Sequence, residues 1–115
     1  MLRGFKKHNN AVRTELDGIK FPSKAEAARY AELKVMQQCG TIRGLRLQPV
    51  YPLVVNGQKI CKYIADFEYE ERGVTVVEDV KGRRLDVYIL KSKLFRALYP
   101  HLDFREISSR SCKLR

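Results

Sequence analysis

Two acids and a lysine interrupt the apolar, strand-like runs of this chain. Asp66 lies within the aromatic run YIADFEY, and Asp79 and Lys81 close the run VTVVEDVKG, which begins mostly with β-branched residues. Because side chains alternate across a strand, Asp79 and Lys81 share one face. Burying unpaired charge is costly, so charged residues at the end of a core strand indicate either a function or a specific pairing.

The spacing of the two acids predicts that they meet across a hairpin. If Arg72-Gly73 forms a two-residue loop, Asp66 lies directly opposite Asp79. A four-residue loop makes the two acids diagonal neighbours on the same face, and only a one-residue bulge separates them. Like charges that face each other destabilise a sheet, so this pair needs a positive partner.

A divalent cation with oxygen ligands would meet this need. Mg²⁺ typically takes one or two carboxylates together with phosphate and water. Lys81 would then hold a phosphate oxygen, or orient and help to deprotonate an attacking water. The pattern therefore favours metal-assisted phosphodiester hydrolysis. The competing interpretation is structural, with Lys81 bridging Asp66 and Asp79 at a solvated strand end.

The overall charge supports a polyanionic partner. The chain has 115 residues, of which 44% are hydrophobic and 31% charged, and its formal net charge is +10. This length suits one globular domain with a modest core. Excess positive charge is typical of proteins that bind nucleic acid, with anionic membrane as the competitor. No run approaches the roughly 20 apolar residues of a membrane span, and the N-terminus lacks the apolar run of a signal peptide, so we expect no membrane association.

The cysteines and histidines favour neither a disulfide framework nor a zinc site. Cys39, Cys61 and Cys112 are odd in number and have no CxxC spacing, and His8 and His101 are isolated. We therefore expect a reduced, cytoplasmic compartment.

Local signals near the N-terminus predict a hairpin and a helix. Asp17-Gly18 predicts the turn of a hairpin between VRTEL and IKF. The following helix should begin after Ser23 as N-cap and stop at Gly40. One face of this helix is expected to pack on a sheet, and that face comprises Ala28, Ala31, Val35, Met36 and Cys39.

The next segments predict three antiparallel strands. The first, LRLQPVYPLVV, contains Pro49 and Pro52 and should be an edge strand or a strand with a bulge. Asn56-Gly57 then turns the chain into QKICKYIADFEYE, and Arg72-Gly73 turns it again into the strand that ends at Lys81.

A second helix and a last strand complete the pattern. Asp86 is the candidate N-cap, Pro100 ends the helix, and LDFREI follows as a strand. The face expected to be buried comprises Val87, Leu90, Leu94 and Leu98.

These elements predict one α/β (α+β) domain over residues 1–115. A mixed central sheet is flanked by helices in the order α-β-β-β-α-β, after an N-terminal hairpin. The core covers about residues 21–107, with a mobile basic arm at 1–11 and a mobile tail at 108–115.

At the two acids and the lysine, the chain resembles the PD-(D/E)XK nuclease superfamily. Asp66 matches its first metal-binding aspartate, and Asp79-Val80-Lys81 matches the (D/E)XK tripeptide, while Ala65 stands in place of the name-giving proline. The expected order of elements is similar to the restriction-endonuclease-like core. More narrowly, DGIKFPSKAEAARYAEL, LQPVYPL, YIADFEY and VVEDVKG resemble a family of small phage and prophage proteins that are grouped with these nucleases.

The resemblance implies a metal site with Mg²⁺ or Mn²⁺ as the cofactor. Its ligands would be Asp66, Asp79 and Glu26, together with the backbone carbonyl of Val80. Lys81 would polarise water or phosphate and complete the catalytic set.

One of these ligands has a second interpretation, and three further side chains are candidates around this site. Glu26 has a second interpretation, because its spacing from Ser23 is that of a capping box. Glu78 points away from the neighbouring acid and is expected to support the site from behind or to be structural. Gln48 resembles polar residues found near such sites, and Tyr88 either lines the site or packs in the core.

The basic residues that follow the tripeptide have two interpretations, a solvated helix face or contact with the DNA backbone. They are Arg83, Arg84, Lys91, Lys93 and Arg96. The aromatic residues that alternate with Asp66 are expected in the core rather than as stacking platforms, and they are Tyr63, Phe67 and Tyr69.

Together with the resemblance, the sequence predicts a small metal-dependent DNA endonuclease, encoded by a phage or prophage and acting in the bacterial cytoplasm. So short a chain favours recognition of DNA shape, such as a four-way (Holliday) junction or another branch, and the resemblance implies a homodimer. Two alternatives stay open. One is a non-catalytic nucleic-acid-binding module, and the other is a nuclease subunit that acts only within a larger DNA-processing complex.

Overall fold

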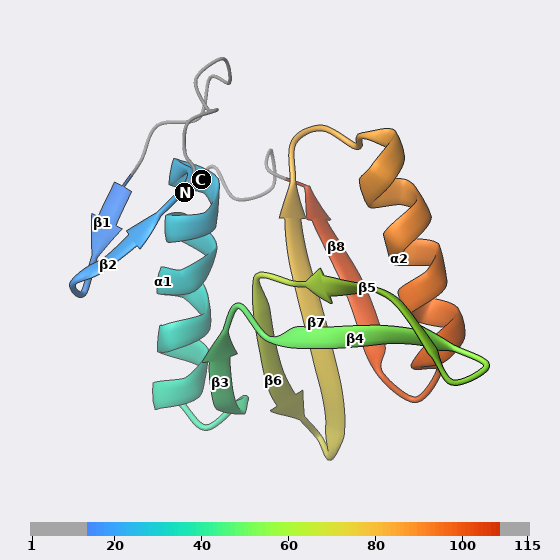
Figure 1. Cartoon of the computed structure of the whole chain (residues 1–115). Helices are drawn as coiled ribbons and strands as arrows, with labels where there is room; N and C mark the ends of the chain where they lie inside the picture. The colour runs from blue at the N-terminus through green and yellow to red at the C-terminus, as the bar shows by residue number, and fades with distance from the viewer. Residues whose placement is uncertain (1–13, 109–115) are drawn as a thin grey trace.

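The structure is a computed structural model that describes residues 14–108 (Figure 1). The arm predicted at 1–11 lies outside the described residues, as does the predicted tail except for Ser108. The described part is an α+β domain with two helices and a mixed main sheet. Its elements are β1 (Thr14–Leu16), β2 (Ile19–Phe21), α1 (Lys24–Gln38), β3 (Arg43–Leu47), β4 (Val50–Val55), β5 (Gln58–Ile64), β6 (Phe67–Glu71), β7 (Val74–Lys81), α2 (Asp86–Leu98) and β8 (Asp103–Ser108).

Three two-residue turns close hairpins, as predicted. They are Asp17-Gly18, Asn56-Gly57 and Arg72-Gly73. Both residues of each turn have positive φ, the conformation that a two-residue hairpin loop requires. The Arg72-Gly73 loop makes Phe67 the partner of Glu78. Asp66 and Asp79 are the next positions outward, so this register brings the two acids to facing positions.

Four strands form the main sheet in the order β3-β6-β7-β8, with β7 and β8 parallel and the other neighbours antiparallel. Helices α1 and α2 lie on opposite sides of this sheet (Figure 1). Successive side chains of β7 point to opposite faces of the sheet, so the strand contributes to two core clusters. Val76 packs in the cluster that contains Leu33 of α1, and Val77 packs in the cluster that contains Phe95 of α2. Apart from β4 and β5, the elements follow the predicted order of helix, three strands, helix and strand.

The first two predicted strands are each broken in the middle. Gln48-Pro49 separates β3 from β4, and Ala65-Asp66 separates β5 from β6. Pairing continues through the bend, because the Gln48 N–H donates to the Asp66 carbonyl at 2.9 Å and the Ala65 N–H donates to the Pro49 carbonyl at 3.1 Å. Strands β4 and β5 therefore leave the main sheet as a two-stranded arm that crosses over β6 and β7 (Figure 1). Both β3 and β4 are edge strands with a register shift, which confirms the expectation from the prolines.

Helix α1 has the predicted ends but only part of the predicted buried face. The Ser23 hydroxyl accepts a hydrogen bond from the Glu26 N–H at 3.2 Å, and Gly40, with a φ of 82°, follows the last turn. The predicted face is only partly right, because Ala28 and Met36 pack against the core while Val35 is 56% exposed. The helix instead buries Ala27, Tyr30 and Leu33. The Tyr30 ring packs 5.1 Å from the ring of Phe21, so the large side chains rather than the alanines decide which face is buried.

Helix α2 lacks the predicted cap. Leu85 occupies the N-cap position without a side-chain hydrogen bond, and Asp86 is the first helical residue. The expectation that Asp86 caps the helix is therefore wrong, although a carboxylate in the first turn still interacts favourably with the helix dipole. The helix ends before Pro100, as predicted.

The predicted buried face of α2 is right only in its second half. Leu94 and Leu98 pack against the core, but Val87 and Leu90 are 66% and 68% exposed. The buried residues of the helix are Ser92 and Phe95. Phe95 determines this rotation, because its ring packs into an aromatic cluster at centroid distances of 4.9 to 5.7 Å. The cluster is formed by Tyr51, Tyr63, Tyr99 and Phe104. Within residues 14–108, neither helix is long and apolar enough to cross a membrane.

Candidate functional site

The end of β7 extends past the end of β6, and Asp66 fills the gap. The last β6–β7 pair is Phe67 with Glu78, whereas β7 continues beside β8 as far as Lys81. The Asp66 N–H donates to the Glu78 carbonyl at 3.1 Å, and its Oδ2 accepts from the Val80 N–H at 2.8 Å. A buried backbone amide needs such a partner, so the missing strand explains why a carboxylate stands here. In a strand the N–H and C=O of one residue point to the same neighbour, so the Val80 carbonyl is directed to this side too.

The Asp66 carboxyl lies near two other carboxyl groups. It interacts with the carboxyls of Glu26, on the first turn of α1, and of Asp79. The pKa of Asp66 is raised to about 7, chiefly by burial and next by Glu26, while hydrogen bonds from Asp79 and the Val80 amide oppose the shift. Burial also raises the pKa of Asp79 to about 7, with the charge of Asp66 as the next cause. The predicted meeting of Asp66 and Asp79 is thus confirmed, and Glu26 lies next to Asp66.

Asp79 has two further partners on its own side of the sheet. The Tyr63 hydroxyl donates to Asp79 Oδ2, and Lys81 Nζ lies 3.7 Å from Oδ1. Burial and the charge of Asp79 raise the pKa of Tyr63. Lys81 is only partly buried, and its Nζ also lies 4.5 Å above the ring of Tyr88. Lys81 therefore stands beside the carboxyls with one face open to a ligand.

Glu78 lies on the opposite face of β7, as the alternation predicts. It is fully buried, and Arg29 of α1 donates to both of its oxygens, from Nε at 2.8 Å and from Nη2 at 2.6 Å. The Tyr69 hydroxyl donates to the same carboxylate. This hydrogen bonding raises the pKa of Arg29. Glu78 is thus held in a closed ion pair behind the sheet, away from the three meeting carboxyls.

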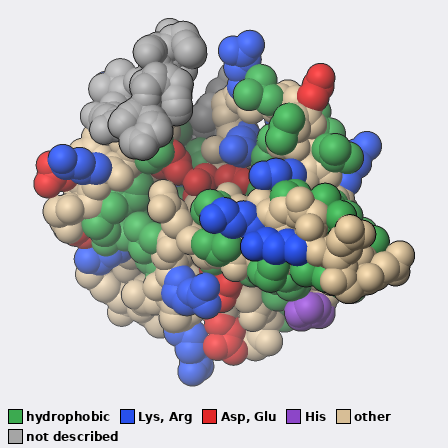
Figure 2. Space-filling model, viewed as in Figure 1, with side chains coloured by type: hydrophobic (Ala, Val, Ile, Leu, Met, Phe, Trp, Pro, Cys, Tyr) green, Lys and Arg blue, Asp and Glu red, His purple; other side chains and the backbone are tan. Residues whose placement is uncertain are grey.

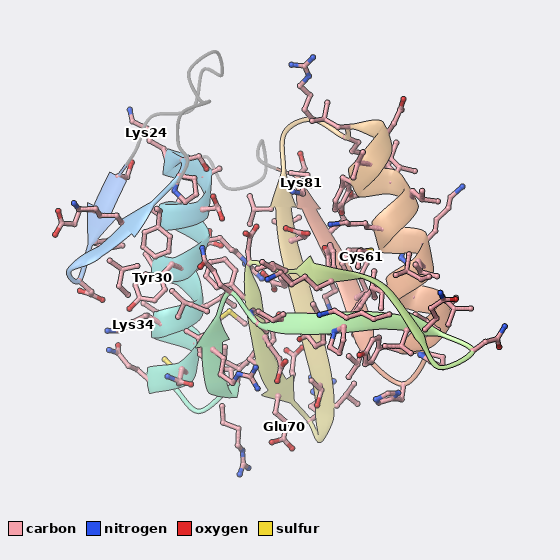
Figure 3. All side chains as sticks on the ribbon, viewed as in Figure 1. Lys24, Tyr30, Lys34, Cys61, Glu70 and Lys81 are labelled. Carbon is pink, nitrogen blue, oxygen red and sulfur yellow. The ribbon has the colours of Figure 1, made fainter. Side chains whose placement is uncertain are left out.

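Two cavities open on either side of the three carboxyls. The smaller, of about 130 Å³, is lined by Ile19, Lys20, Phe21, Glu26, Leu47, Gln48, Asp66 and Phe67. The larger, of about 390 Å³, is lined by Lys62, Tyr63, Ile64, Asp79, Lys81, Leu85, Val87, Tyr88 and Lys91. In the space-filling view, acidic side chains lie in a depression with Lys and Arg side chains beside it (Figure 2). Figure 3 shows Lys24, at the start of α1, and Lys81, at the end of β7, at this same end of the molecule.

Other predicted site residues divide into those near the cavities and those away from them. Gln48 lines the smaller cavity at the bend, with a φ of 51°, and Tyr88 lines the larger one while its hydroxyl donates to Glu106 at 2.7 Å. Of the predicted DNA-contacting residues, Lys91 lines the larger cavity. Arg84 instead lies 3.5 Å from Glu106.

The remaining basic candidates lie elsewhere on or near α2. Arg83 and Lys93 are exposed and do not line either cavity, and Arg96 lies 4.9 Å over the ring of Phe104. The predicted core aromatics are all buried, which confirms that expectation, although Tyr63 also contacts Asp79.

Two lysines near the site were not predicted from the sequence. Lys20 lines the smaller cavity and Lys62 the larger one. Each lies on the outward face of a short strand, where a lysine is ordinary. Only the fold of the arm over α2 brings Lys62 to the cavity, so no local signal identifies it.

The carboxylates of Asp66, Asp79 and Glu26 are the possible metal ligands at this site. Among residues 14–108, no three or more His, Cys, Asp or Glu side chains form a ready-made metal cage. Mg²⁺ does not need one, because it usually takes one or two carboxylates from the protein and completes its shell with water and phosphate. Touching carboxyls with raised pKa values are the kind of oxygen donors that such an ion neutralises. Asp66 and Asp79 are therefore the described side chains that offer oxygen donors of the kind a hard divalent cation takes.

The fold and the site define a small, basic α+β protein with a partly buried group of carboxyls next to a lysine-lined cavity. The family model described as "Protein of unknown function (DUF1064)" matches residues 6–115, and the chain belongs to this family. No curated protein and no solved structure matches the chain.

Proposed function

We propose that this protein is a metal-dependent endonuclease that hydrolyses phosphodiester bonds in DNA. The observation that carries the proposal is the contact of the Asp66 carboxyl with those of Glu26 and Asp79. Such a cluster is electrostatically unfavourable without a cation, whereas Glu78 on the other face of the same strand is fully compensated. Unfavourable charge clusters of this kind are typical of functional sites.

The proposed cofactor is Mg²⁺ or Mn²⁺. Asp66, Asp79 and Glu26 would hold it, with the Val80 carbonyl as a further oxygen donor. When bound, the ion would neutralise the carboxylates and stabilise the negative charge that develops on the phosphoryl group.

The chain's own groups have separate tasks in this proposal. Lys81 is on the same face as Asp79 and is partly open, so it can hold a phosphate oxygen or orient the attacking water. The Tyr63 hydroxyl and the Val80 N–H each hold one carboxylate in a fixed orientation. Preorganised groups of this kind lower the cost of reaching the transition state.

The order of elements in and around the main sheet supports a restriction-endonuclease-like domain, and with it the resemblance to PD-(D/E)XK nucleases. The formal net charge of +10 suits a DNA substrate. We also propose that branched DNA, such as a Holliday junction, is the substrate, that the protein acts as a homodimer, and that it works in the cytoplasm of a bacterial host of a phage or prophage.

Cleavage of labelled DNA with Mg²⁺ tests the proposal. The substrates are a four-way junction, a flap, a single strand and a duplex, and the key variant is Asp79→Asn. Its control is Glu70→Gln, which removes the same charge from an exposed acid at the far end of the sheet (Figure 3). We expect Asp79→Asn to lose at least about a hundred-fold in rate, since even groups behind metal ligands cost about 10- to 100-fold, while Glu70→Gln stays active.

Two outcomes would replace this proposal with another. If the wild type and Asp79→Asn bind DNA equally, without metal dependence and without products, the protein is a nucleic-acid-binding module. If the wild type binds Mg²⁺ but cuts none of the substrates, it is a subunit that needs a larger complex.

A further inference from the structure

We infer that the larger cavity holds an unpaired nucleotide of the DNA strand next to the bond that is cut. The cavity, of about 390 Å³, lies between the arm, the end of β7 and the first half of α2. The inference rests on the proposed function, because it takes the ligand to be the strand under attack. It goes further in naming what that strand must present, which is a base free of its partner.

The walls of the cavity are apolar and open. Ile64, Leu85 and Val87 line it and are 47%, 60% and 66% exposed. Single exposed apolar residues are ordinary, but three that line one cavity give it an apolar part that water wets poorly. At about 390 Å³, the cavity lies within the roughly 300–1,000 Å³ range of sites that enclose small molecules.

The same cavity carries positive charge from three elements. Lys62 comes from β5, Lys81 from β7 and Lys91 from α2. The Lys91 Nζ donates to the Lys62 carbonyl at 3.1 Å, which links β5 to α2 beside the cavity. Lys and Arg side chains lie among hydrophobic ones on this face of the molecule (Figure 2).

This combination selects a nucleotide rather than a bare phosphate. Contacts to the DNA backbone need only cations and polar donors, so lysines alone would serve an intact duplex. An apolar wall beside them suits a flat base, whose faces are apolar and whose phosphate is anionic. In a duplex the base is stacked and paired, so it reaches such a cavity only from an unpaired position or after flipping.

The position of the cavity connects base binding with cleavage. Asp79 and Lys81 line it and also belong to the proposed catalytic site. A nucleotide in the cavity would therefore place an adjoining phosphate beside the carboxyls. This predicts preference for DNA with an unpaired nucleotide at the cut.

Binding of a modified single strand to the full chain tests the inference. The probe is an oligonucleotide with one 2-aminopurine base, whose fluorescence reports unstacking, and the reference carries an abasic site at that position. A chelator removes divalent cations, so no strand is cut. We expect the base-containing probe to bind the wild type about five-fold or more tighter than the abasic one, the gain typical of contact with one base.

Matched variants show whether this cavity is responsible. Val87→Ser changes a residue that lines the cavity. Leu90→Ser changes a residue of α2 that is equally exposed but does not line it. Lys91→Gln and Lys93→Gln form the corresponding pair for charge. We expect Val87→Ser to abolish most of the preference for the base, Lys91→Gln to weaken both probes alike, and the two controls to have little effect. Thermal unfolding of each variant verifies that it is folded.

The outcomes separate this inference from the proposed function. Equal affinity for the two probes, or equal effects of Val87→Ser and Leu90→Ser, would overturn the inference even if DNA is cut with Mg²⁺. Base preference that depends on Val87, in a protein that cuts no DNA, would support the cavity as a nucleotide site and overturn the nuclease proposal alone.

Discussion

Glu78 and Asp79 are neighbours on β7 and both are almost completely buried, at 0% and 2% exposed, yet their surroundings are opposite. Glu78 is matched by two hydrogen bonds from Arg29 and one from Tyr69. Asp79 faces the carboxyl of a second acid, and its pKa is raised to about 7. A buried acid with a complete set of partners supports the fold. A buried acid that faces another acid is tolerated at a cost to stability, which indicates a site kept for a ligand.

The largest expected effect is a difference in the free energy of unfolding between variants of Glu78 and of Asp79. Glu78→Gln leaves the buried side of Arg29 without its counter-charge, so we expect the free energy of unfolding to fall by about 3 kcal/mol or more. Asp79→Asn removes a repulsion and should leave stability at pH 8 unchanged or raised. Urea unfolding of both variants checks the contrast, which fails if Asp79→Asn is the more destabilised of the two.

The pH dependence of stability is the second test. The pKa values of Asp66 and Asp79, about 7 in the folded chain against an ordinary 3.8, mean that the folded state binds protons more tightly than the unfolded state. Their stabilising contribution is therefore complete below pH about 4 and is lost as pH rises through about 7. We expect wild-type stability to fall from pH 5 to pH 8 by on the order of 1 kcal/mol or more, since one pKa unit corresponds to about 1.4 kcal/mol.

The Asp66→Asn and Asp79→Asn variants serve as controls for this pH effect. Each should show a smaller fall in stability between pH 5 and pH 8 than the wild type. The same fall in all three proteins would assign the pH dependence to other groups.

Metal binding should restore the stability that the folded protein loses at high pH. At a Mg²⁺ concentration about a hundred times its Kd, binding to the folded state stabilises by about 2.7 kcal/mol. We expect a rise in Tm at pH 8 for the wild type and for Lys91→Gln, and none for Asp79→Asn. A rise of the same size in Asp79→Asn would show that the ion binds elsewhere.

The smallest effect on stability is expected at Lys81. Its ion pair with Asp79 is partly exposed and 3.7 Å long, so Lys81→Gln should change the free energy of unfolding by less than about 1 kcal/mol. If Lys81 is catalytic, the same variant loses DNA cleavage while keeping the Mg²⁺-dependent rise in Tm. Full cleavage by Lys81→Gln would leave only the salt-bridge interpretation.

The sequence predicts those features that depend on a few neighbouring residues. The Arg72-Gly73 loop fixes the register of β6 and β7, and the register brings Asp66 to Asp79, so two residues carry most of the site prediction. The Ser23 cap was equally local.

Features that depend on distant packing were not predictable. The buried faces of both helices follow from contacts of Tyr30 and Phe95 with other elements, and the leucine and alanine patterns fit more than one face. The break at Ala65-Asp66 has no glycine or proline of its own and lies opposite Gln48-Pro49, which belongs to a different part of the chain. The lysines around the larger cavity come together only when the arm crosses α2.

The β4–β5 arm leaves the main sheet at Asp66, which is also one of the clustered acids. Lys62 and Ile64 lie at the end of the arm near Asp66. The turn at Asn56-Gly57 lies at the other end of the β4–β5 pairing. Insertions at this turn would therefore change the reach of the arm without moving the acids. If the proposed function holds, proteins built on this plan would differ in the DNA shapes that the arm contacts while the acids stay in the same arrangement.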